Sequence, residues 1–186
     1  MSATRVRAVR VNGLSEDITQ IDLEDIDLPP PGDGEIQISI KACAVNFPDL
    51  LMVQGKYQFK PPMPFTPGME AAGDVTQVGP GVSAFKPGDK VVAGLRTGGM
   101  AQGANTAASA CRPMPHGMSY EEAAGYTTAY LTAYVALERR GNLQAGETLL
   151  VHGAAGGVGM AAVDLGKQMG ATVIATASSQ QKLDVL

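Results

Sequence analysis

Residues 148–160 read TLLVHGAAGGVGM, a short apolar run followed by a loop that contains four glycines. Residues 148–151 are rich in types that favour β-strands. Glycine loses more conformational freedom on folding than any other residue, so a loop this rich in glycine has an entropic cost. The presence of such a loop at the end of a strand therefore indicates that a ligand or another backbone segment approaches the loop closely.

The residues after the loop predict a helix and then a second strand. Apolar residues recur with helical spacing at 158, 161, 162, 165 and 169, and Gly170 is a suitable helix stop. Thr172–Thr176 has the composition of a strand, and Ser178 or Ser179 is a candidate N-cap for another helix. A strand, a loop, a helix and a strand in this order form a βαβ unit with parallel strands.

Two classes of phosphate-binding loop join a strand to a helix. A nucleoside-triphosphate loop needs Lys-Ser or Lys-Thr after its last glycine, but Met160 and Ala161 follow Gly159, which excludes that class. The G-x-x-G-x-x-G spacing is a variant of the dinucleotide-binding pattern, in which backbone N–H groups at the helix start hold the pyrophosphate. A purely structural glycine turn is the alternative. The residues predicted to contact the dinucleotide here are Gly153, Ala155, Gly156, Gly157, Val158 and Gly159.

The end of the second strand indicates which dinucleotide binds. Sites that prefer NAD place Asp or Glu there to accept the ribose 2′-hydroxyl. Residues 173–181 contain no acid, whereas the Ser178 hydroxyl and the Lys182 ammonium group can hold a 2′-phosphate. The sequence therefore favours NADPH as the cofactor, the alternative being a capping serine and a solvated lysine.

The first part of the chain reads as β-structure. Residues 5–11 and 35–41 alternate polar and apolar side chains, as half-buried strands do. DVTQVG (74–79) and DKVVAG (89–94) are further strand-like pieces between glycine and proline turns, which favours a small barrel or sandwich. The acidic stretch 16–27 is interpreted as a solvated edge. A capping box at 119–122 then predicts a helix that ends at Gly141.

Composition excludes several classes of protein. Apolar residues make up 45% and charged residues 17% of the 186 residues, which is typical of a folded globular protein. A net charge of −4 gives no basic excess for nucleic acid or anionic lipid. There is no apolar run of about 18 residues, as a membrane span needs, and residues 1–13 lack the apolar region of a signal peptide, so we expect none. Cys43 and Cys111 provide no disulfide framework, so we expect a cytoplasmic protein. From the charge and the lack of a membrane span, we expect no nucleic-acid or membrane partner.

Four stretches taken together resemble one family. KACAVNFPDLLMVQGKY (41–57), PFTPGMEAAGDVTQVGPGVSAFKPGDKVVA (64–93), EEAAGYTTAYLTAYVALERRG (121–141) and GETLLVHGAAGGVG (146–159) are similar to the zinc-independent quinone oxidoreductases. These form the zeta-crystallin-like branch of the medium-chain dehydrogenase/reductase superfamily. The resemblance implies an α/β protein that acts as a homodimer or larger homo-oligomer.

The resemblance also implies a GroES-like, β-rich catalytic domain followed by a Rossmann domain, with the active site in the cleft between them. We expect the first at residues 1–120. A Rossmann domain is a doubly wound parallel sheet built from two βαβαβ halves. Since only the first βαβ unit is present, we expect residues 121–186 to be the N-terminal part of a truncated domain.

Metal ligands are missing from the positions where the zinc-bearing relatives carry them. Those relatives place a cysteine where this chain has Asn46 and a histidine where it has Met69. Asparagine and methionine are poor zinc ligands, and two separated cysteines cannot form a Cys₄ site. The sequence therefore predicts neither a catalytic nor a structural zinc ion.

Without a Lewis acid, a reductase suits acceptors that are already electrophilic, such as quinones, enones or enoyl thioesters. The Asn46 amide can donate a hydrogen bond to the reduced acceptor, the Tyr57 phenol can protonate it, and Asp49 can orient Asn46. The resemblance places the asparagine and the tyrosine at the substrate pocket, and matches Thr132 to a threonine that contacts the nicotinamide. The alternatives are that Asp49 caps a helix, Tyr57 packs in a loop turn and Thr132 is an ordinary helix residue.

The combined prediction is a zinc-independent, NADPH-dependent reductase of quinones or activated double bonds. Two alternatives stay open at this point. One is an enone or enoyl-CoA reductase, which differs only in its acceptor. The other is a non-catalytic dinucleotide-binding or structural protein, which needs the glycine loop but neither Asn46 nor Tyr57.

Overall fold

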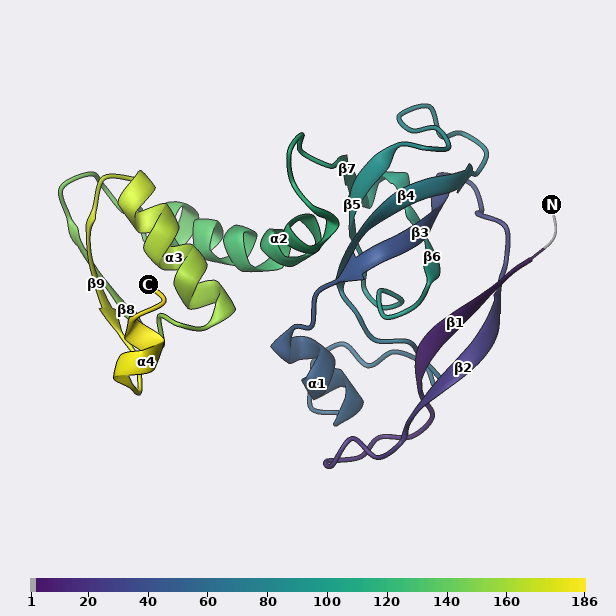
Figure 1. Ribbon diagram of the computed structural model, residues 1–186, viewed down its shortest axis with the longest axis horizontal. Helices are drawn as coiled ribbons and strands as arrows, with labels where there is room; N and C mark the ends of the chain where they lie inside the picture. Colours follow the sequence, from purple (N-terminus) through teal and green to yellow (C-terminus); the bar gives the residue numbers. More distant parts are fainter. Residues whose placement is uncertain (1–2) are drawn as a thin grey trace. The chain divides into compact units, whose positions relative to one another are not determined.

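The computed structural model describes residues 3–186 and divides into two compact units, one ending at Gly125 and the other formed by Tyr126–Leu186 (Figure 1). The division lies within helix α2 (Tyr120–Tyr134), a few residues after the boundary expected between residues 120 and 121. The first turn of α2 belongs to the first unit, where the Tyr120 hydroxyl donates a hydrogen bond to Asp74. No helix within the described residues is both long and apolar enough to cross a membrane.

The first unit is built from antiparallel strands, as the alternating sequence predicts. Five of them form one sheet in the order β6-β3-β4-β5-β7, and β1 and β2 pair separately. Helix α1 (Phe47–Val53) follows β3, and a short 3-10 helix (Ala108–Ala110) precedes β7. The strands are β1 (Thr4–Val11), β2 (Ile21–Leu28), β3 (Glu35–Cys43), β4 (Glu70–Val78), β5 (Lys90–Gly94), β6 (Gly103–Ala107) and β7 (Cys111–Pro113).

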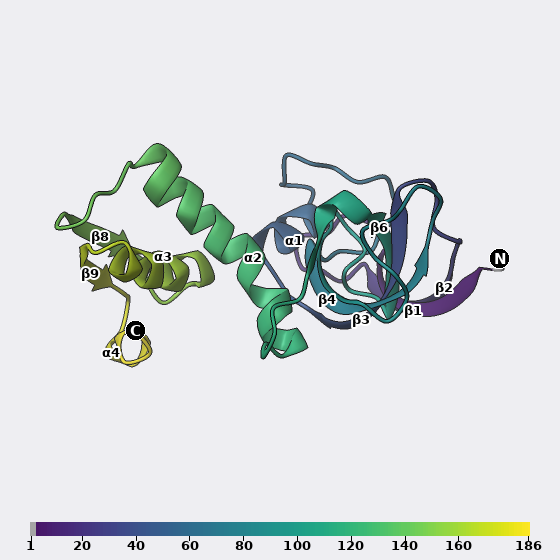
Figure 2. The same cartoon turned by 90° about the horizontal axis from the view of Figure 1, so that it is seen from above.

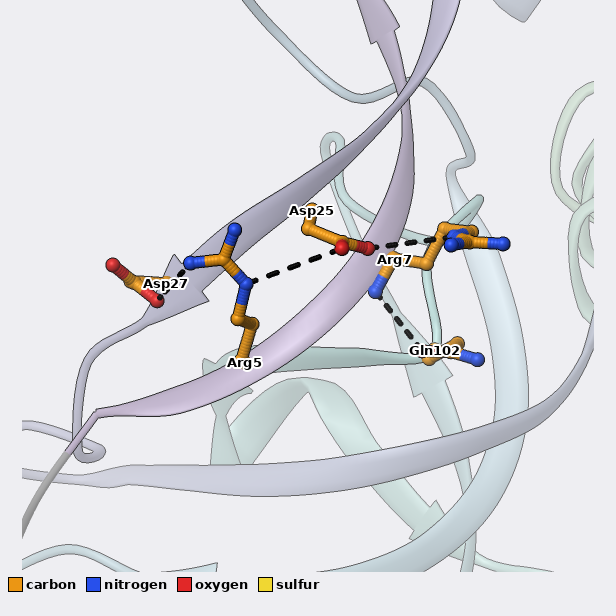
Figure 3. A network of polar contacts seen from close by, with 5 residues as sticks. All are labelled: Arg5, Arg7, Asp25, Asp27 and Gln102. Atoms are coloured by element: carbon orange, nitrogen blue, oxygen red, sulfur yellow. Dashed lines mark hydrogen bonds and ion pairs between the residues drawn. The ribbon is translucent and has the colours of Figure 1, made fainter.

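The acidic stretch interpreted as a solvated edge contains strand β2, whose carboxylates face the arginines of β1. Arg7 Nε lies 3.4 Å from Asp25 Oδ1, and Arg5 Nη1 lies 3.7 Å from Asp27 Oδ1 (Figure 3). The Arg7 backbone N–H also donates to Gln102 Oε1 at 2.9 Å. Because these side chains are exposed, each ion pair contributes at most about 1 kcal/mol to stability.

Strand β3 departs from the alternation that its sequence predicts. Ile36 and Ile38 lie in the main hydrophobic cluster, but Gln37 between them is also buried, at 3% exposure. The Gln37 amide donates to the Pro29 carbonyl and to Asn105 Oδ1, both at 3.1 Å. Side chains on both faces of β3 are therefore buried around Gln37. The polar Gln37 side chain tolerates burial because its amide group is hydrogen-bonded.

The second unit contains the predicted βαβ arrangement. Strands β8 (Thr148–His152) and β9 (Thr172–Thr176) pair in parallel, and helix α3 (Gly157–Gln168) packs against both (Figure 2). Leu149, Val151 and Val173 contribute to the apolar cluster between them. A short helix, α4 (Gln180–Leu183), follows β9.

The helix signals read from the sequence are confirmed. The capping box is confirmed, since Ser119 N donates to Glu122 Oε2 and Glu122 N donates to Ser119 Oγ. Gly170 follows α3 with φ +83°, as a glycine stop should. The predicted helix end at Gly141 is confirmed, since Gly141 is the C-cap after Arg140. Residues Val135–Arg140 form a π-helix in which Gly141 N bonds the Ala136 carbonyl at 2.7 Å, so Gly141 stays right-handed and Asn142 turns left-handed instead.

Candidate functional site

The glycine loop between β8 and α3 has a geometry that favours glycine at two positions. Gly153 has φ +63°, a left-handed conformation that side chains disfavour. A Cβ atom at Gly159 would lie 2.5 Å from the Gly153 carbonyl oxygen, well inside van der Waals contact. The loop backbone therefore folds directly onto the first turn of α3, as a dinucleotide-binding loop requires.

The first turn of α3 presents backbone donors that the helix itself does not use. Gly156 is the N-cap and makes no side-chain capping bond, so the N–H groups of Gly157, Val158 and Gly159 start the helix without intrahelical partners. Val158 is 44% exposed, although the helical periodicity places it on the packed face. Its exposure keeps this turn open to solvent, where the helix dipole favours an anion.

A pocket of about 400 Å³ lies beside the loop at the carboxyl ends of β8 and β9. It brings together five of the predicted cofactor residues, while Gly157, Val158 and Gly159 form the adjoining helix turn. Its lining contains no carboxylate. The lining residues are His152, Gly153, Ala155, Gly156, Thr176, Ala177, Ser178 and Lys182.

His152 and Thr176 were not predicted to line this pocket. They are the last residues of β8 and β9, and His152 Nδ1 lies 3.0 Å from Thr176 Oγ1. The available signal was that ligands of parallel sheets bind at the carboxyl ends of the strands. Thr132, in contrast, is exposed on α2 and is not part of the pocket lining.

The two serines after β9 have different roles. Ser179 is the N-cap of α4 and accepts a hydrogen bond from Lys182 N. The Ser178 hydroxyl lies 3.2 Å from Lys182 Nζ, and both side chains line the pocket. The capping role that the sequence left open thus belongs to Ser179, and Ser178 remains beside the lysine with which it was predicted to act.

The predicted catalytic residues lie in the first unit, at the start of α1. Asn46 is the N-cap of this helix. The Asp49 carboxylate accepts hydrogen bonds from Asn46 N at 2.8 Å and from Gly68 N at 2.9 Å. Burial raises the pKa of Asp49, and the two N–H donors act in the opposite direction. The Asp49 carboxylate therefore holds the backbone of Asn46, and the Asp49 backbone N–H faces the Asn46 side chain, as in a capping box.

The Asn46 side chain has a different partner. Its amide nitrogen donates to Glu70 Oε1 at 3.0 Å, and Glu70, the first residue of β4, is only 2% exposed. Sequence reasoning missed Glu70 because the two residues are far apart in the chain. The one signal was its position directly after Met69, where the zinc-bearing relatives carry a histidine ligand.

Cys43 lies near the same carboxylates. Burial raises the pKa of its thiol to about 12, and the charges of Asp49 and Glu70 act in the same direction. Burial likewise raises the pKa of Cys111 to about 11. Because the thiolate is the reactive form, neither residue suits nucleophilic chemistry at neutral pH.

The Tyr57 side chain lies among apolar residues. It is half-buried and packs against the apolar cluster of Val11, Met52, Val53 and Phe65, and Met69 packs there as well. Its backbone N–H bonds the Leu51 carbonyl at 3.1 Å. Within residues 3–186, no group of three or more His, Cys, Asp or Glu residues is arranged to hold a metal ion.

A family model described as the alcohol dehydrogenase GroES-like domain matches residues 32–145. The human synaptic vesicle membrane protein VAT-1 homolog is 46% identical over 154 residues, which is 82% of this chain and 39% of that protein. The mouse quinone oxidoreductase-like protein 2 is 37% identical over 177 residues, which is 95% of this chain and 50% of that protein.

Solved structures show the same likeness. The quinone oxidoreductase from Thermus thermophilus, whose structures include a complex with NADPH, matches with a TM-score of 0.79 and 36% identity. The match covers 95% of this chain and 55% of that one, so the chain spans about half the length of its relatives. With a GroES-like family model over more than half of its residues and a βαβ unit behind it, the chain belongs to the alcohol dehydrogenase GroES-like domain family of the medium-chain dehydrogenase/reductases and is similar to its quinone oxidoreductases.

Proposed function

We propose that the protein is a zinc-independent, NADPH-dependent reductase of quinones or other activated double bonds. The observation that carries the proposal is the pocket beside the glycine loop, where Lys182 and Ser178 lie together and no carboxylate is present. A carboxylate there would accept the 2′-hydroxyl of NADH and repel the 2′-phosphate of NADPH.

The residues of the second unit fit such a dinucleotide. The N–H groups in the first turn of α3 hold the pyrophosphate, and the absence of a side chain at Gly159 lets the loop pack tightly. The Lys182 ammonium group and the Ser178 hydroxyl hold the 2′-phosphate. When it is bound, NADPH supplies the hydride.

The residues of the first unit fit the acceptor. The Asn46 amide nitrogen carries two hydrogens, of which one is donated to Glu70, and the other donates to the acceptor oxygen that becomes negative during reduction. The Tyr57 phenol supplies a proton to the product. We assign these roles without a metal, because Asn46 and Met69 occupy the positions at which zinc-bearing relatives carry ligands.

The names of the relatives support this proposal, since the mouse protein is a quinone oxidoreductase-like protein and the Thermus enzyme was solved with NADPH. We further propose that the complete protein acts as a homodimer or larger homo-oligomer in the cytoplasm. Analytical ultracentrifugation of the complete protein and fractionation of cells test these two points separately.

The test is to measure NADPH consumption by the complete protein with a panel of quinones, enones and enoyl thioesters. The proposal predicts turnover with quinones or enones, and NADPH preferred over NADH by about tenfold or more, which corresponds to about 1.4 kcal/mol. Turnover with enoyl thioesters alone would identify an enoyl reductase instead. Tight NADPH binding without turnover of any acceptor would identify a non-catalytic dinucleotide-binding protein.

A further inference from the structure

We infer that Glu70 is a positioning residue, which fixes the orientation of the Asn46 amide so that an N–H group, and not the carbonyl oxygen, faces the acceptor. This inference rests on the proposed function, in which Asn46 donates a hydrogen bond to the acceptor. It assigns a role to a buried carboxylate that neither binds the cofactor nor reacts itself.

The chemistry of the pair determines the amide orientation. Asn46 Nδ2 lies 3.0 Å from Glu70 Oε1. A carboxylate only accepts hydrogen bonds, so the amide must turn its nitrogen toward it, because its oxygen would meet a like partial charge. A free asparagine side chain, in contrast, exchanges nitrogen and oxygen by a half-turn of its last bond, with little energetic preference.

Burial makes this selection strong. Glu70 is 2% exposed, so little water competes for its oxygens, and a hydrogen bond to a charged group is stronger than one between neutral groups. Glu70 also lies in a strand with fixed register, opposite Gly94 in β5. The sheet thus holds the backbone of Glu70, from which the carboxylate reaches the amide.

The backbone of Asn46 is held independently. The Asp49 carboxylate bonds Asn46 N at 2.8 Å, while the Glu70 carboxylate bonds the side chain. The Asp49 backbone N–H also faces the Asn46 side chain in a capping box, which suits the amide oxygen, while the Glu70 carboxylate accepts from the amide nitrogen. A change at Glu70 therefore removes the partner of the amide nitrogen and leaves the capping contacts at the start of α1 in place.

A double-mutant cycle in the complete protein tests the inference, with NADPH and 1,4-benzoquinone as substrates. Asn46→Ala should lower kcat by about 100-fold, as loss of one oxyanion donor does, and Glu70→Leu should lower it by about 10-fold or more. KM for NADPH should change by less than about twofold, since only transition-state stabilisation is lost. If Glu70 acts through Asn46, then adding Glu70→Leu to Asn46→Ala should lower kcat no further.

Equal factors in both backgrounds would show that Glu70 acts independently of Asn46, and would overturn the inference while the proposed function stands. Glu70→Gln covers the case in which the leucine variant does not fold, because a glutamine carbonyl can still accept the amide and should give a smaller loss of kcat. Glu35→Gln, on neighbouring strand β3, is the matched control and should leave kcat unchanged.

A second readout does not depend on activity. The side-chain amide protons of Asn46 should exchange slowly with solvent and give separate, shifted resonances in the ¹⁵N-labelled protein, because one of them is donated to a buried carboxylate. Glu70→Gln should move these resonances and speed their exchange. Unchanged resonances would overturn the inference even if the protein reduced no quinone, and a protein that shows the shift but no turnover would contradict only the proposed function.

Discussion

The Lys182 ammonium nitrogen lies 3.2 Å from the Ser178 hydroxyl oxygen, and both side chains line the pocket beside the glycine loop. Lys182→Ala should therefore weaken NADPH binding and leave NADH binding nearly unchanged. Hydrogen bonds to charged groups contribute about 1.5–3 kcal/mol, which predicts a loss of NADPH affinity of about tenfold or more.

Fluorescence titration with each cofactor measures this difference. Lys167→Ala is the control, since Lys167 lies in the last turn of α3 and outside the pocket lining. An equal loss of affinity for NADPH and NADH in Lys182→Ala would remove the 2′-phosphate role of the lysine.

Gly159 should not tolerate a side chain. Its Cβ atom would lie 2.5 Å from the Gly153 carbonyl oxygen and 2.8 Å from Ala154 Cα, both of which are backbone atoms that cannot turn aside. Gly159→Ala should lower the free energy of unfolding by about 1–3 kcal/mol, as overpacking does. Gly157→Ala is the matched control in the same helix turn, because a Cβ atom there meets nothing within 4 Å. Chemical denaturation without cofactor compares the two variants, and an equal change in both would contradict the close packing of the loop.

Tyr57→Phe separates the packing of this side chain from its proposed chemistry. The ring packs against the apolar cluster under α1, so phenylalanine should keep the stability within about 0.5 kcal/mol. If the phenol supplies the proton, kcat should fall by about 100-fold, the lower range for general acid catalysis. Steady-state kinetics and thermal unfolding measure the two effects, with the exposed Tyr134→Phe as control. Full activity in Tyr57→Phe would leave the tyrosine a packing residue only.

Tyr120 should be among the last tyrosines to ionise. Its hydroxyl donates a hydrogen bond to Asp74 Oδ1 at 2.5 Å, and this bond raises the pKa of the phenol from its ordinary value of 10.0 to about 12. Between these two pH values the folded chain binds more protons than the unfolded chain, so the stabilisation is present below the lower value and is lost as pH rises to the higher one. Asp74→Asn should lower the pKa of Tyr120 in a spectroscopic tyrosine titration. An unchanged titration curve would show that Asp74 does not perturb this phenol.

The features that depend on neighbouring residues were predictable from the sequence. The glycine loop and the Ser119–Glu122 capping box depend on residues a few positions apart, and the parallel strands β8 and β9 follow one another with a single helix between them, so local patterns predict all three. The position of Gly141 was predicted, but not its conformation, because the π-helix before it shifts the hydrogen bonds by one residue.

The features that depend on distant residues were not predictable. Gln37 is buried because Asn105 and Pro29 supply its hydrogen-bond partners from other parts of the chain. The Asn46 amide meets Glu70 for the same reason, since β4 brings the carboxylate to the start of α1. Asp49 was expected to orient the Asn46 side chain, but its carboxylate reaches the backbone N–H, which is nearer along the helix start.

Single-turnover oxidation of NADPH by 1,4-benzoquinone, compared with NADH under the same conditions, tests the central claim most directly. The acid-free pocket with Lys182 and Ser178 predicts quinone-dependent oxidation of NADPH, with binding about tenfold or more tighter than that of NADH. Equal binding of the two cofactors, or no oxidation of NADPH by any quinone or enone, would contradict it.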